Sequence, residues 1–225
     1  MKRISVVFAV IIAAIPSLYG QVTFVPKAGI SYAHVSLSHD FVYDEEEYKS
    51  KFGLILGVAV EIPLINERLT LQPELLLHQK GFTYKYTDVD YQDKYSYTLN
   101  YVEVPILMKA AYRKFYGEIG PSVGIGLWGK YKGTTTSKGQ QTSNEGKIKF
   151  GKEPDNASVD DHYIDNALDV GLQLGVGVKL AIIIIDLRYA IGLTNLYDDF
   201  GSYKNLRSKN GSLQLTIGLP VGHRK

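Results

Sequence analysis

The 225-residue chain contains no cysteine. This absence excludes a disulfide framework, a thiolate metal site and a cysteine nucleophile. After residue 20 there is also no charge-free apolar run that would suit a membrane-spanning helix, so a helical membrane protein is not expected. The chain after residue 20 also has no net charge. Lys2 and Arg3 account for two of the 25 basic residues, so 23 basic residues remain against 23 acidic ones. A balanced chain carries no electrostatic footprint for nucleic acid.

Several motifs of catalysis and metal binding are also absent. No G-x-S-x-G motif occurs, and the glycines of "GVGVKL" and "GPSVGIG" do not precede a helix, as nucleotide binding requires. No pair of histidines has the spacing of a zinc site. The five are His34, His39, His78, His162 and His223. We therefore expect no cofactor, no metal site and no enzymatic activity.

The first twenty residues differ from the rest of the chain. Lys2 and Arg3 precede the apolar run "ISVVFAVIIAAI", and "PSLYG" ends in a small residue before Gln21. A basic start, a short apolar core and a small residue at the end are typical of a secretory signal peptide. We expect residues 1–20 to be a signal peptide and residues 21–225 to form the mature domain.

Apolar residues alternate with small or polar ones between residues 168 and 180. The even positions are all leucine or valine. The odd positions are Asp169, Gly171, Gln173, Gly175, Gly177 and Lys179. A period of two is that of a β-strand, because a helix would scatter the apolar side chains around its surface. The apolar stretch 168–193 is therefore predicted to be two strands joined by a tight turn at Ala181.

Eight segments share this alternation. They are residues 22–37, 52–62, 69–78, 102–110, 115–127, 168–180, 183–193 and 212–219. The connections alternate in length, with short ones near 63–68, 113–114 and 180–182. The long, polar ones are 39–50, 88–94, 132–166 and 198–209. In an antiparallel meander, all short turns therefore lie at one end and all long loops at the other.

This layout is typical of a transmembrane β-barrel, which has short periplasmic turns, longer extracellular loops and apolar side chains that face lipid. The predicted fold is all-β: an eight-stranded antiparallel up-and-down transmembrane β-barrel of the OmpA and OmpX type. Four prolines lie inside or beside the predicted strands, where each removes a ladder hydrogen bond. We expect bulges, or strand ends, at Pro73, Pro105, Pro121 and Pro220.

A soluble eight-stranded barrel, such as a lipocalin, is the main alternative fold. Its apolar side chains would point inward and its exterior would carry many charges, whereas the polar faces here are rich in glycine. Tyrosines also cluster where strands meet loops, as membrane interfaces select. These aromatic residues are Tyr84, Tyr86, Tyr95, Tyr97, Tyr101, Trp128, Tyr131 and Tyr197 toward the long loops, and Tyr112, Phe115 and Tyr116 beside a short turn. Both features favour the membrane barrel.

Ten charged residues lie on the strand face that is expected to point into the lumen. They are Lys27, Glu61, Glu74, Glu103, Lys109, Glu118, Asp169, Lys179, Asp186 and Arg188. An eight-stranded barrel is just wide enough for its side chains to fill it, so we expect these residues to pair as a plug. His78 and Lys80 are expected near the outer end, and inward glycines should leave room for Arg188. A narrow gated pore and a catalytic pair of glutamates are the alternatives.

Two long loops carry acidic residues. Loop 39–50 contains Asp44, Glu45, Glu46 and Glu47, and loop 132–166 contains Asp160 and Asp161. One interpretation is a solvated acidic surface, and the other is recognition of a partner or of cations near lipopolysaccharide phosphates. A loop as long as 132–166 without structure of its own is either functional or mobile. If the protein recognises a partner, these two loops are the expected site.

Three segments resemble a known family. They are "LQPELLLHQKGF" (71–82), "LNYVEVPILMKAAY" (99–112) and "FYGEIGPSVGIGL" (115–127). Their order is similar to that in the outer-membrane β-barrel domain common in Bacteroidetes, the group that resembles PorT, a component of the Por secretion system. The resemblance covers nearly the whole mature chain. It implies a short barrel in a Gram-negative outer membrane and transfers no catalytic residue.

The leading hypothesis is a non-enzymatic outer-membrane barrel with a structural, surface-recognition or secretion-associated role through its extracellular loops. The expected partners are outer-membrane lipid and lipopolysaccharide, the barrel assembly machinery and, from the resemblance, secretion-system proteins. A narrow passive channel and a lipid-modifying outer-membrane enzyme are the alternative functions.

Overall fold

The computed structural model describes residues 22–38, 46–65, 68–154, 161–197 and 207–221. The expected signal peptide lies outside these residues. The strands are β1 (Thr23–Ser38), β2 (Glu46–Ile65), β3 (Leu69–Thr87), β4 (Tyr91–Tyr112), β5 (Phe115–Ser137), β6 (Gln140–Phe150), β7 (Asp161–Ile164), β8 (Leu168–Lys179), β9 (Ile184–Gly192) and β10 (Arg207–Gly218). In the part of the chain described, no helix is long and apolar enough to cross a membrane.

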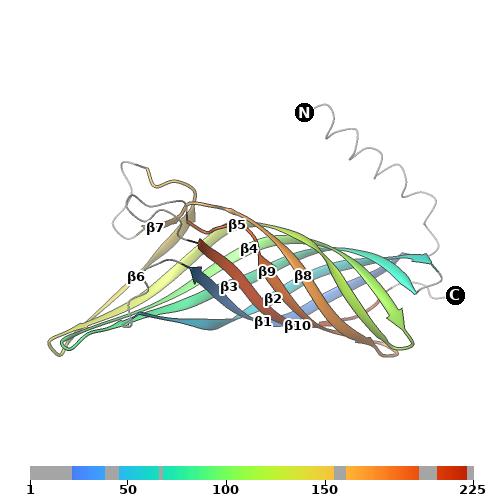
Figure 1. The fold of residues 1–225 in the computed structure, drawn as a ribbon, viewed down its shortest axis with the longest axis horizontal. Coiled ribbons are helices and arrows are strands. Elements are labelled where there is room, and N and C mark those ends of the chain that lie inside the picture. Colours follow the sequence, from blue (N-terminus) through green and yellow to red (C-terminus); the bar gives the residue numbers. More distant parts are fainter. Residues whose placement is uncertain (1–21, 39–45, 66–67, 155–160, 198–206, 222–225) are drawn as a thin grey trace.

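Eight of the strands close into a ring (Figure 1). Their order is β1–β2–β3–β4–β5–β8–β9–β10, and β10 pairs back with β1. Every pairing in the ring is antiparallel. β6 pairs with the distal part of β5, and β7 pairs with β6 in parallel, so both lie outside the ring. The predicted eight-stranded antiparallel barrel is confirmed.

The outer surface of the ring is apolar. Phe52, Leu54, Ile119, Leu174 and Leu215 are between 44% and 69% exposed. They alternate along their strands with buried polar or small residues. A continuous apolar belt of this kind faces hydrocarbon in membrane barrels, and it exceeds the patches that soluble proteins tolerate.

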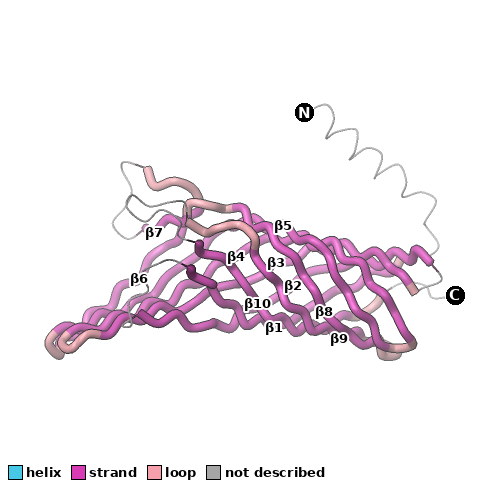
Figure 2. The backbone as a smooth tube through the Cα atoms, in the orientation of Figure 1, coloured by secondary structure: helices cyan, strands magenta, loops and turns pink. Residues whose placement is uncertain are grey.

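The two ends of the ring differ. At the short-turn end, β4 passes into β5 at Arg113 and Lys114, and β8 is joined to β9 by residues 180–183. β1 begins at the same end, where Phe24 is bridged to Val221 after β10. At the opposite, long-hairpin end, several strands continue well beyond the ring (Figures 1 and 2). Figure 2 shows that they remain strands nearly to their tips.

We call this one-sided projection the extension. It consists of residues 46–50 of β2, 82–87 of β3, 91–99 of β4, 129–137 of β5, and β6. β7 pairs with β6 in parallel and lies beside the extension. The predicted loops at 88–94 and 132–166 are therefore wrong in large part, because they form two long hairpins and a short strand. The alternation of apolar and polar residues does not predict these strands, because both faces of the segments carry polar residues.

The described strands have three register shifts, of which one, between Pro63 and Ile65, lies at the end of β2, and the other two change which side chains point inward. In β5, Asn100 pairs with Trp128 but Tyr101 pairs with Gly126, which leaves Leu127 unpaired. Leu127 and Trp128 are consequently both exposed. The second irregularity lies between Ser50 and Ile55 of β2. An extra residue exchanges the faces of all later positions, and both shifts lie where the ring gives way to the extension.

Part of the predicted tyrosine belts is wrong. Tyr112 and Trp128 are exposed on the outer surface as expected. Tyr101, Tyr116 and Tyr131 are instead only 1% to 7% exposed. Tyr101 shares the inward face of its strand with the charged lumen residues, and the bulge in β5 turns Tyr131 inward.

The bulges expected at the strand prolines are also wrong. The β3–β4 ladder keeps its register past Pro73, and the β4–β5 ladder keeps it past Pro105. Pro121 pairs with Leu172 in an unshifted ladder. Each proline omits one hydrogen bond but inserts no residue, so the register is unchanged. Pro220 follows the end of β10, as the alternative expectation stated.

Candidate functional site

The charged residues predicted for the lumen lie inside the ring. Nine of the ten are at most 7% exposed, and Lys179, at the short-turn end, is the partly exposed tenth. Seven ring strands supply them, and β10 adds the buried polar residues Asn210 and Thr216. We call this set, together with His78, Lys80, Gln72 and Gln173, the lumen network.

Arg188 lies at the centre of the lumen network. Its guanidinium donates two hydrogen bonds to Glu74, with Nη1–Oε2 and Nη2–Oε1 distances of 2.7 and 2.8 Å. The Nε atom donates to Glu118, and Nη2 lies 3.4 Å from Asp186. Lys27 joins the same carboxylates, 3.0 Å from Glu74 and 2.5 Å from Asp186. Bidentate, charge-assisted pairing of this kind fixes geometry as well as charge.

A second group of ion pairs lies toward the long-hairpin end. Lys80 is 3.0 Å from Asp169 and 3.2 Å from Glu103. Glu103 also contacts His78 Nδ1 at 2.7 Å and accepts a 2.6 Å hydrogen bond from Gln173. Because each carboxylate meets donors from different strands, burying it does not leave the charge unpartnered.

A third group lies toward the short-turn end. Glu61 accepts hydrogen bonds from Lys109 at 3.3 Å and from Lys179 at 2.9 Å. Lys109 also donates to Gln72 at 2.9 Å, and Gln72 donates to Glu74 of the central group at 2.5 Å. The central and third groups are therefore connected through Gln72.

Inward glycines make room for the largest lumen side chains, as expected. A Cβ atom on Gly175 would lie 2.8 Å from Cγ of Arg188. One on Gly177 would lie 2.2 Å from the ring of Tyr116, whose hydroxyl donates to Asp186. Because the glycines of β8 have no side chains, they leave the space that Arg188 and Tyr116 occupy in the lumen.

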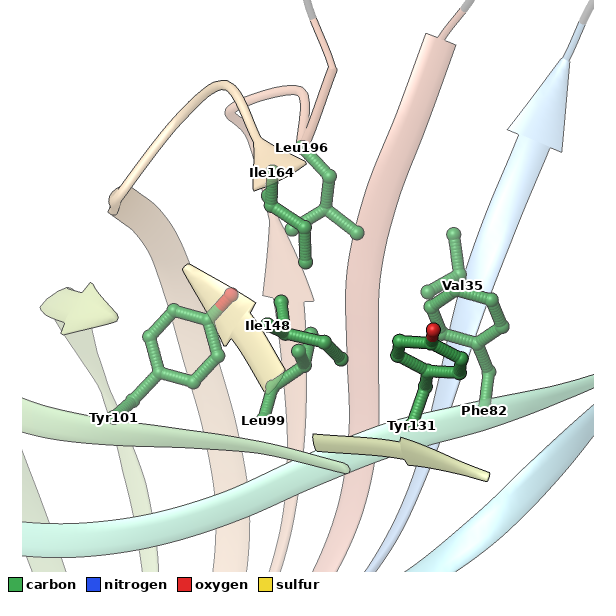
Figure 3. Close-up of a cluster of buried hydrophobic side chains, with 8 residues drawn as sticks. All are labelled: Val35, Phe82, Leu99, Tyr101, Tyr131, Ile148, Ile164 and Leu196. Atoms are coloured by element: carbon green, nitrogen blue, oxygen red, sulfur yellow. The ribbon is translucent and has the colours of Figure 1, made fainter. Parts of the chain in front are cut away.

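A cluster of apolar side chains lies next to the lumen network at the long-hairpin end, and Figure 3 shows its members. This cluster, which we call the cap, consists of Val35, Phe82, Leu99, Tyr101, Tyr131, Ile148, Ile164 and Leu196. Its members come from β1, β3, β4, β5, β6, β7 and the segment after β9, so it spans the width of the barrel. It rests directly on the network, since Lys80 Nζ lies 5.2 Å from the centroid of the Tyr101 ring.

The lumen network borders a small cavity. A cavity beside Lys80, Glu103 and Asp169 has a volume of about 10 Å³, which is room for about one water molecule. At the short-turn end, Val25, Ala59, Tyr116 and Ile184 form a second apolar cluster. This second cluster lies beside the third group of ion pairs, since Val25 and Ala59 are paired one step inside Glu61 and Ile184 is paired with Lys179.

The predicted loop residues are not brought together in the described part of the chain. Asp44, Glu45 and Asp160 lie outside the described residues. Glu46 and Glu47 begin β2, where Glu47 pairs with Lys49 at 3.1 Å on the surface. Asp161 begins β7 and pairs with Lys149 of β6 at 2.6 Å. The hydrogen bond to Asp161 raises the pKa of Lys149, and this pair fastens β7 to β6.

Sequence reasoning missed a pocket in the extension. Its volume is about 600 Å³. Aromatic residues from four strands line it: Tyr84, Tyr95, Tyr97, Tyr131 and His162. Ser143, Asn144 and Glu145 of β6 complete the lining. The signal in the sequence was the alternation of tyrosines at 84 and 86 and at 95 and 97, which reads as a strand face rather than an interfacial belt.

Within the described ranges, no group of three or more His, Cys, Asp or Glu side chains is placed to hold a metal ion. The three histidines in the described ranges lie apart from one another. His78 belongs to the lumen network, His34 contacts Tyr189, and His162 packs on Tyr131.

Comparison with known proteins gives one family match. The family described as "Outer membrane protein beta-barrel domain" matches residues 17–198. No curated protein matches the sequence.

Several solved structures are similar in outline. Neisserial surface protein A is 12% identical, with 87% of this chain and 96% of that chain covered and a TM-score of 0.44. Ail, the attachment invasion locus protein of Yersinia pestis, is 15% identical, with 88% and 99% covered and a TM-score of 0.37. The outer membrane protein OprG from Pseudomonas aeruginosa is 6% identical, with 91% and 97% covered and a TM-score of 0.33.

Proposed function

Since the chain belongs to the outer membrane protein β-barrel domain family, we propose that it is a non-conducting, non-enzymatic barrel that recognises a surface partner through the extension. Bacterial barrels of this kind place short turns in the periplasm and long connections outside the cell. The extension then projects from the cell surface, and the short turns and both strand ends near Phe24 and Val221 face the periplasm.

The observation that carries the proposal is the contrast between a filled lumen and a projecting sheet. Ion pairs that link seven strands and an apolar cap of eight side chains occupy the path that an ion would take. The extension, by contrast, continues β4 and β5 in paired register as far as Tyr91 and Ser137. Strands that continue outside the membrane are not needed to cross it. Their length therefore supports a role in binding.

Single-channel recording tests the non-conducting part. Purified protein is reconstituted in planar bilayers, and heat-modifiable migration on a gel verifies that it is folded. We expect no steady conductance. A steady conductance that changes in Glu103→Ala or Arg188→Ala would establish a channel through the lumen instead.

A trimmed barrel tests the recognition part. Residues 85–94 and 132–145 are each replaced by Asn-Gly, which closes a two-residue hairpin between the paired positions that remain. Cells that display the full or the trimmed barrel are compared for attachment to surfaces coated with polysaccharide or with protein. We expect the full barrel to increase attachment to at least one coating and the trimmed barrel not to. Equal attachment by both would refute recognition through the extension.

A secretion-associated role, which the PorT resemblance suggests, makes a different prediction. Deletion of the gene would then deplete a set of proteins from the culture medium, and the trimmed barrel would restore them if only the membrane section matters. Quantitative proteomics of the medium separates this role from surface recognition, for which the secreted proteins stay unchanged.

A further inference from the structure

We propose that the pocket of the extension binds a neutral oligosaccharide. This inference rests on the proposed surface-recognition function and gives it a ligand class. The pocket volume of about 600 Å³ lies within the range of roughly 300–1,000 Å³ that is usual for small-molecule sites.

One wall of the pocket is aromatic and continuous across three strands. Tyr84 is paired with Tyr95 across β3 and β4, and Tyr97 is paired with Tyr131 across β4 and β5. The rings of Tyr95 and Tyr97 each have their centroid 6.3 Å from that of Tyr131. Gly133 leaves room for the ring of Tyr95 in this arrangement, because a Cβ at residue 133 would lie 2.2 Å from that ring. Tyr84, Tyr95 and Tyr97 are only half-buried, so part of each ring is available to a ligand.

β7 adds a fifth ring. His162 lies with its centroid 4.1 Å from that of Tyr131. The parallel pairing of β7 with β6 and the ion pair between Lys149 and Asp161 hold it there. Burial lowers the pKa of His162, although Glu153 opposes the shift, which favours the neutral form of the ring.

Beside this wall, β6 adds a polar group in the same sheet. Asn144 pairs with Gly133 and so lies on the face of the sheet that carries Tyr131, whereas Ser143 and Glu145 alternate with it and point to the other face. Asn144 supplies an amide that both donates and accepts hydrogen bonds. Sugar hydroxyls donate and accept hydrogen bonds, and the C–H groups of a pyranose form an apolar face that packs on the electron-rich face of an aromatic ring. An aromatic wall with the amide of Asn144 beside it suits both parts of such a ligand.

The charge of the lining selects against other ligands with flat rings. Single-stranded nucleic acid also stacks on aromatic side chains, but its sites add a positively charged groove for the phosphates. The described lining contains no lysine or arginine, and its charged member, Glu145, is paired with Lys132 at 3.6 Å. An acyl chain would leave the amide of Asn144 without a hydrogen-bond partner. We therefore assign the pocket to an uncharged sugar chain.

The test uses the full chain, folded in lauryldimethylamine oxide micelles, because detergents with sugar headgroups would compete. Maltohexaose and the hexasaccharide of N-acetylglucosamine serve as neutral probes, and a sulfated hexasaccharide as the charged comparison. Binding is measured by calorimetry and by saturation-transfer NMR. We expect at least one neutral probe to bind, and the sulfated one to bind at least about tenfold more weakly.

Variants locate the site. Tyr97→Ala should weaken binding of that probe at least about tenfold. Tyr97 also stacks on Phe82, so Asn144→Ala, an exposed change on β6, is the second variant and should weaken binding several-fold without affecting folding. Tyr112→Ala, an exposed tyrosine at the short-turn end, is the matched control and should bind as the wild type does.

Three results would overturn the inference: no neutral probe binds, Asn144→Ala binds as tightly as the wild type, or Tyr112→Ala loses binding equally. Failure here is distinguishable from failure of surface recognition. Cells that attach only to the protein coating, in a manner that trimming abolishes, would keep the recognition role and exclude the sugar ligand.

Discussion

The ring and the extension are parts of the same strands, yet their inward faces carry opposite chemistry. Along β3, Glu74 and Lys80 in the ring give way to Phe82 and Tyr84 in the extension. Along β4, the change runs from Glu103 to the tyrosines at 97 and 95. One ladder of hydrogen bonds thus supports an ionic interior in one half and an aromatic surface in the other.

Enclosure explains the difference. Inside the ring, strands surround each charge, so Arg188 of β9 reaches Glu74 of β3 and Glu118 of β5 directly across the lumen. The extension is open on one side and offers no opposite strand. There, side chains find partners only along the sheet, where aromatic pairs on neighbouring strands are favourable. Buried ion pairs need a closed wall, and cross-strand aromatic pairs do not.

The largest effect is expected from removing the central cation of the ring. Arg188→Ala leaves Glu74 and Glu118 buried without their main partner. Breaking a buried ion pair on one side costs about 3–5 kcal/mol, so the free energy of unfolding should fall by that amount. Urea unfolding in lipid vesicles, followed by tryptophan fluorescence and gel migration, measures it.

Two further variants control this prediction. Arg188→Lys keeps the charge but loses the bidentate geometry, and should recover part of the loss. Arg207→Ala removes an exposed arginine at the start of β10 and should leave stability unchanged. If Arg188→Ala unfolds at the wild-type urea concentration, the lumen network does not hold the ring together.

The next largest effect concerns the cap that separates the two regions. Ile148 of β6 is 1% exposed and packs in the cap. Truncation of a buried isoleucine to alanine costs about 2–4 kcal/mol, and this loss should fall on the extension, since Ile148 lies outside the ring. Amide exchange should accelerate in β6 and in residues 129–137 but not in β8 or β9.

Exposed Lys147, the neighbour of Ile148 on β6, provides the control for that experiment, because Lys147→Ala removes no cap contact. Faster exchange throughout the ring in Ile148→Ala would mean that the cap and the lumen network unfold together, and the division into two regions would be wrong.

The ring was predictable from the sequence because its outward face meets hydrocarbon. Lipid requires an unbroken apolar face, so the alternation from Leu168 to Leu180 and in seven other segments identifies both the strands and their inward side. The same parity located charged residues such as Glu103 and Arg188 inside the ring. The pairing among them was not predictable, because it depends on which strands face each other across the lumen.

The extension was not predictable from the sequence because it does not face hydrocarbon. In water neither face of a strand has to be uniformly apolar, and stretches such as "TTTSKGQQTSNEGK" show no period. The bulge at Leu127 also exchanges the faces of β5, so that Tyr131 points inward against the parity of the ring. One inserted residue therefore places Tyr131 on the aromatic wall, a position that the parity of the ring does not predict.

A smaller effect is expected where a glycine makes room in the ring. Gly177→Ala places a methyl group 2.2 Å from the ring of Tyr116, so the tyrosine must move from Asp186. Overpacking of this kind costs about 1–3 kcal/mol. Gly117→Ala is the matched control, since a Cβ there meets nothing closer than 3.9 Å. Urea unfolding should show a loss in the first variant only, and equal behaviour of the two would mean that Tyr116 has other space.

The smallest effect should come from an ion pair in the extension. Lys132 and Glu145 lie 3.6 Å apart, with side chains 70% and 76% exposed. Water screens such a pair, which typically contributes about 0–1 kcal/mol, whereas Lys27 makes the same kind of contact inside the ring with both partners buried. Lys132→Ala should therefore leave the urea midpoint nearly unchanged at any salt concentration, and Lys27→Ala should lower it clearly. A large loss from Lys132→Ala would show that charge, and not only aromatic pairing, organises the extension, and enclosure would no longer explain why the two regions differ.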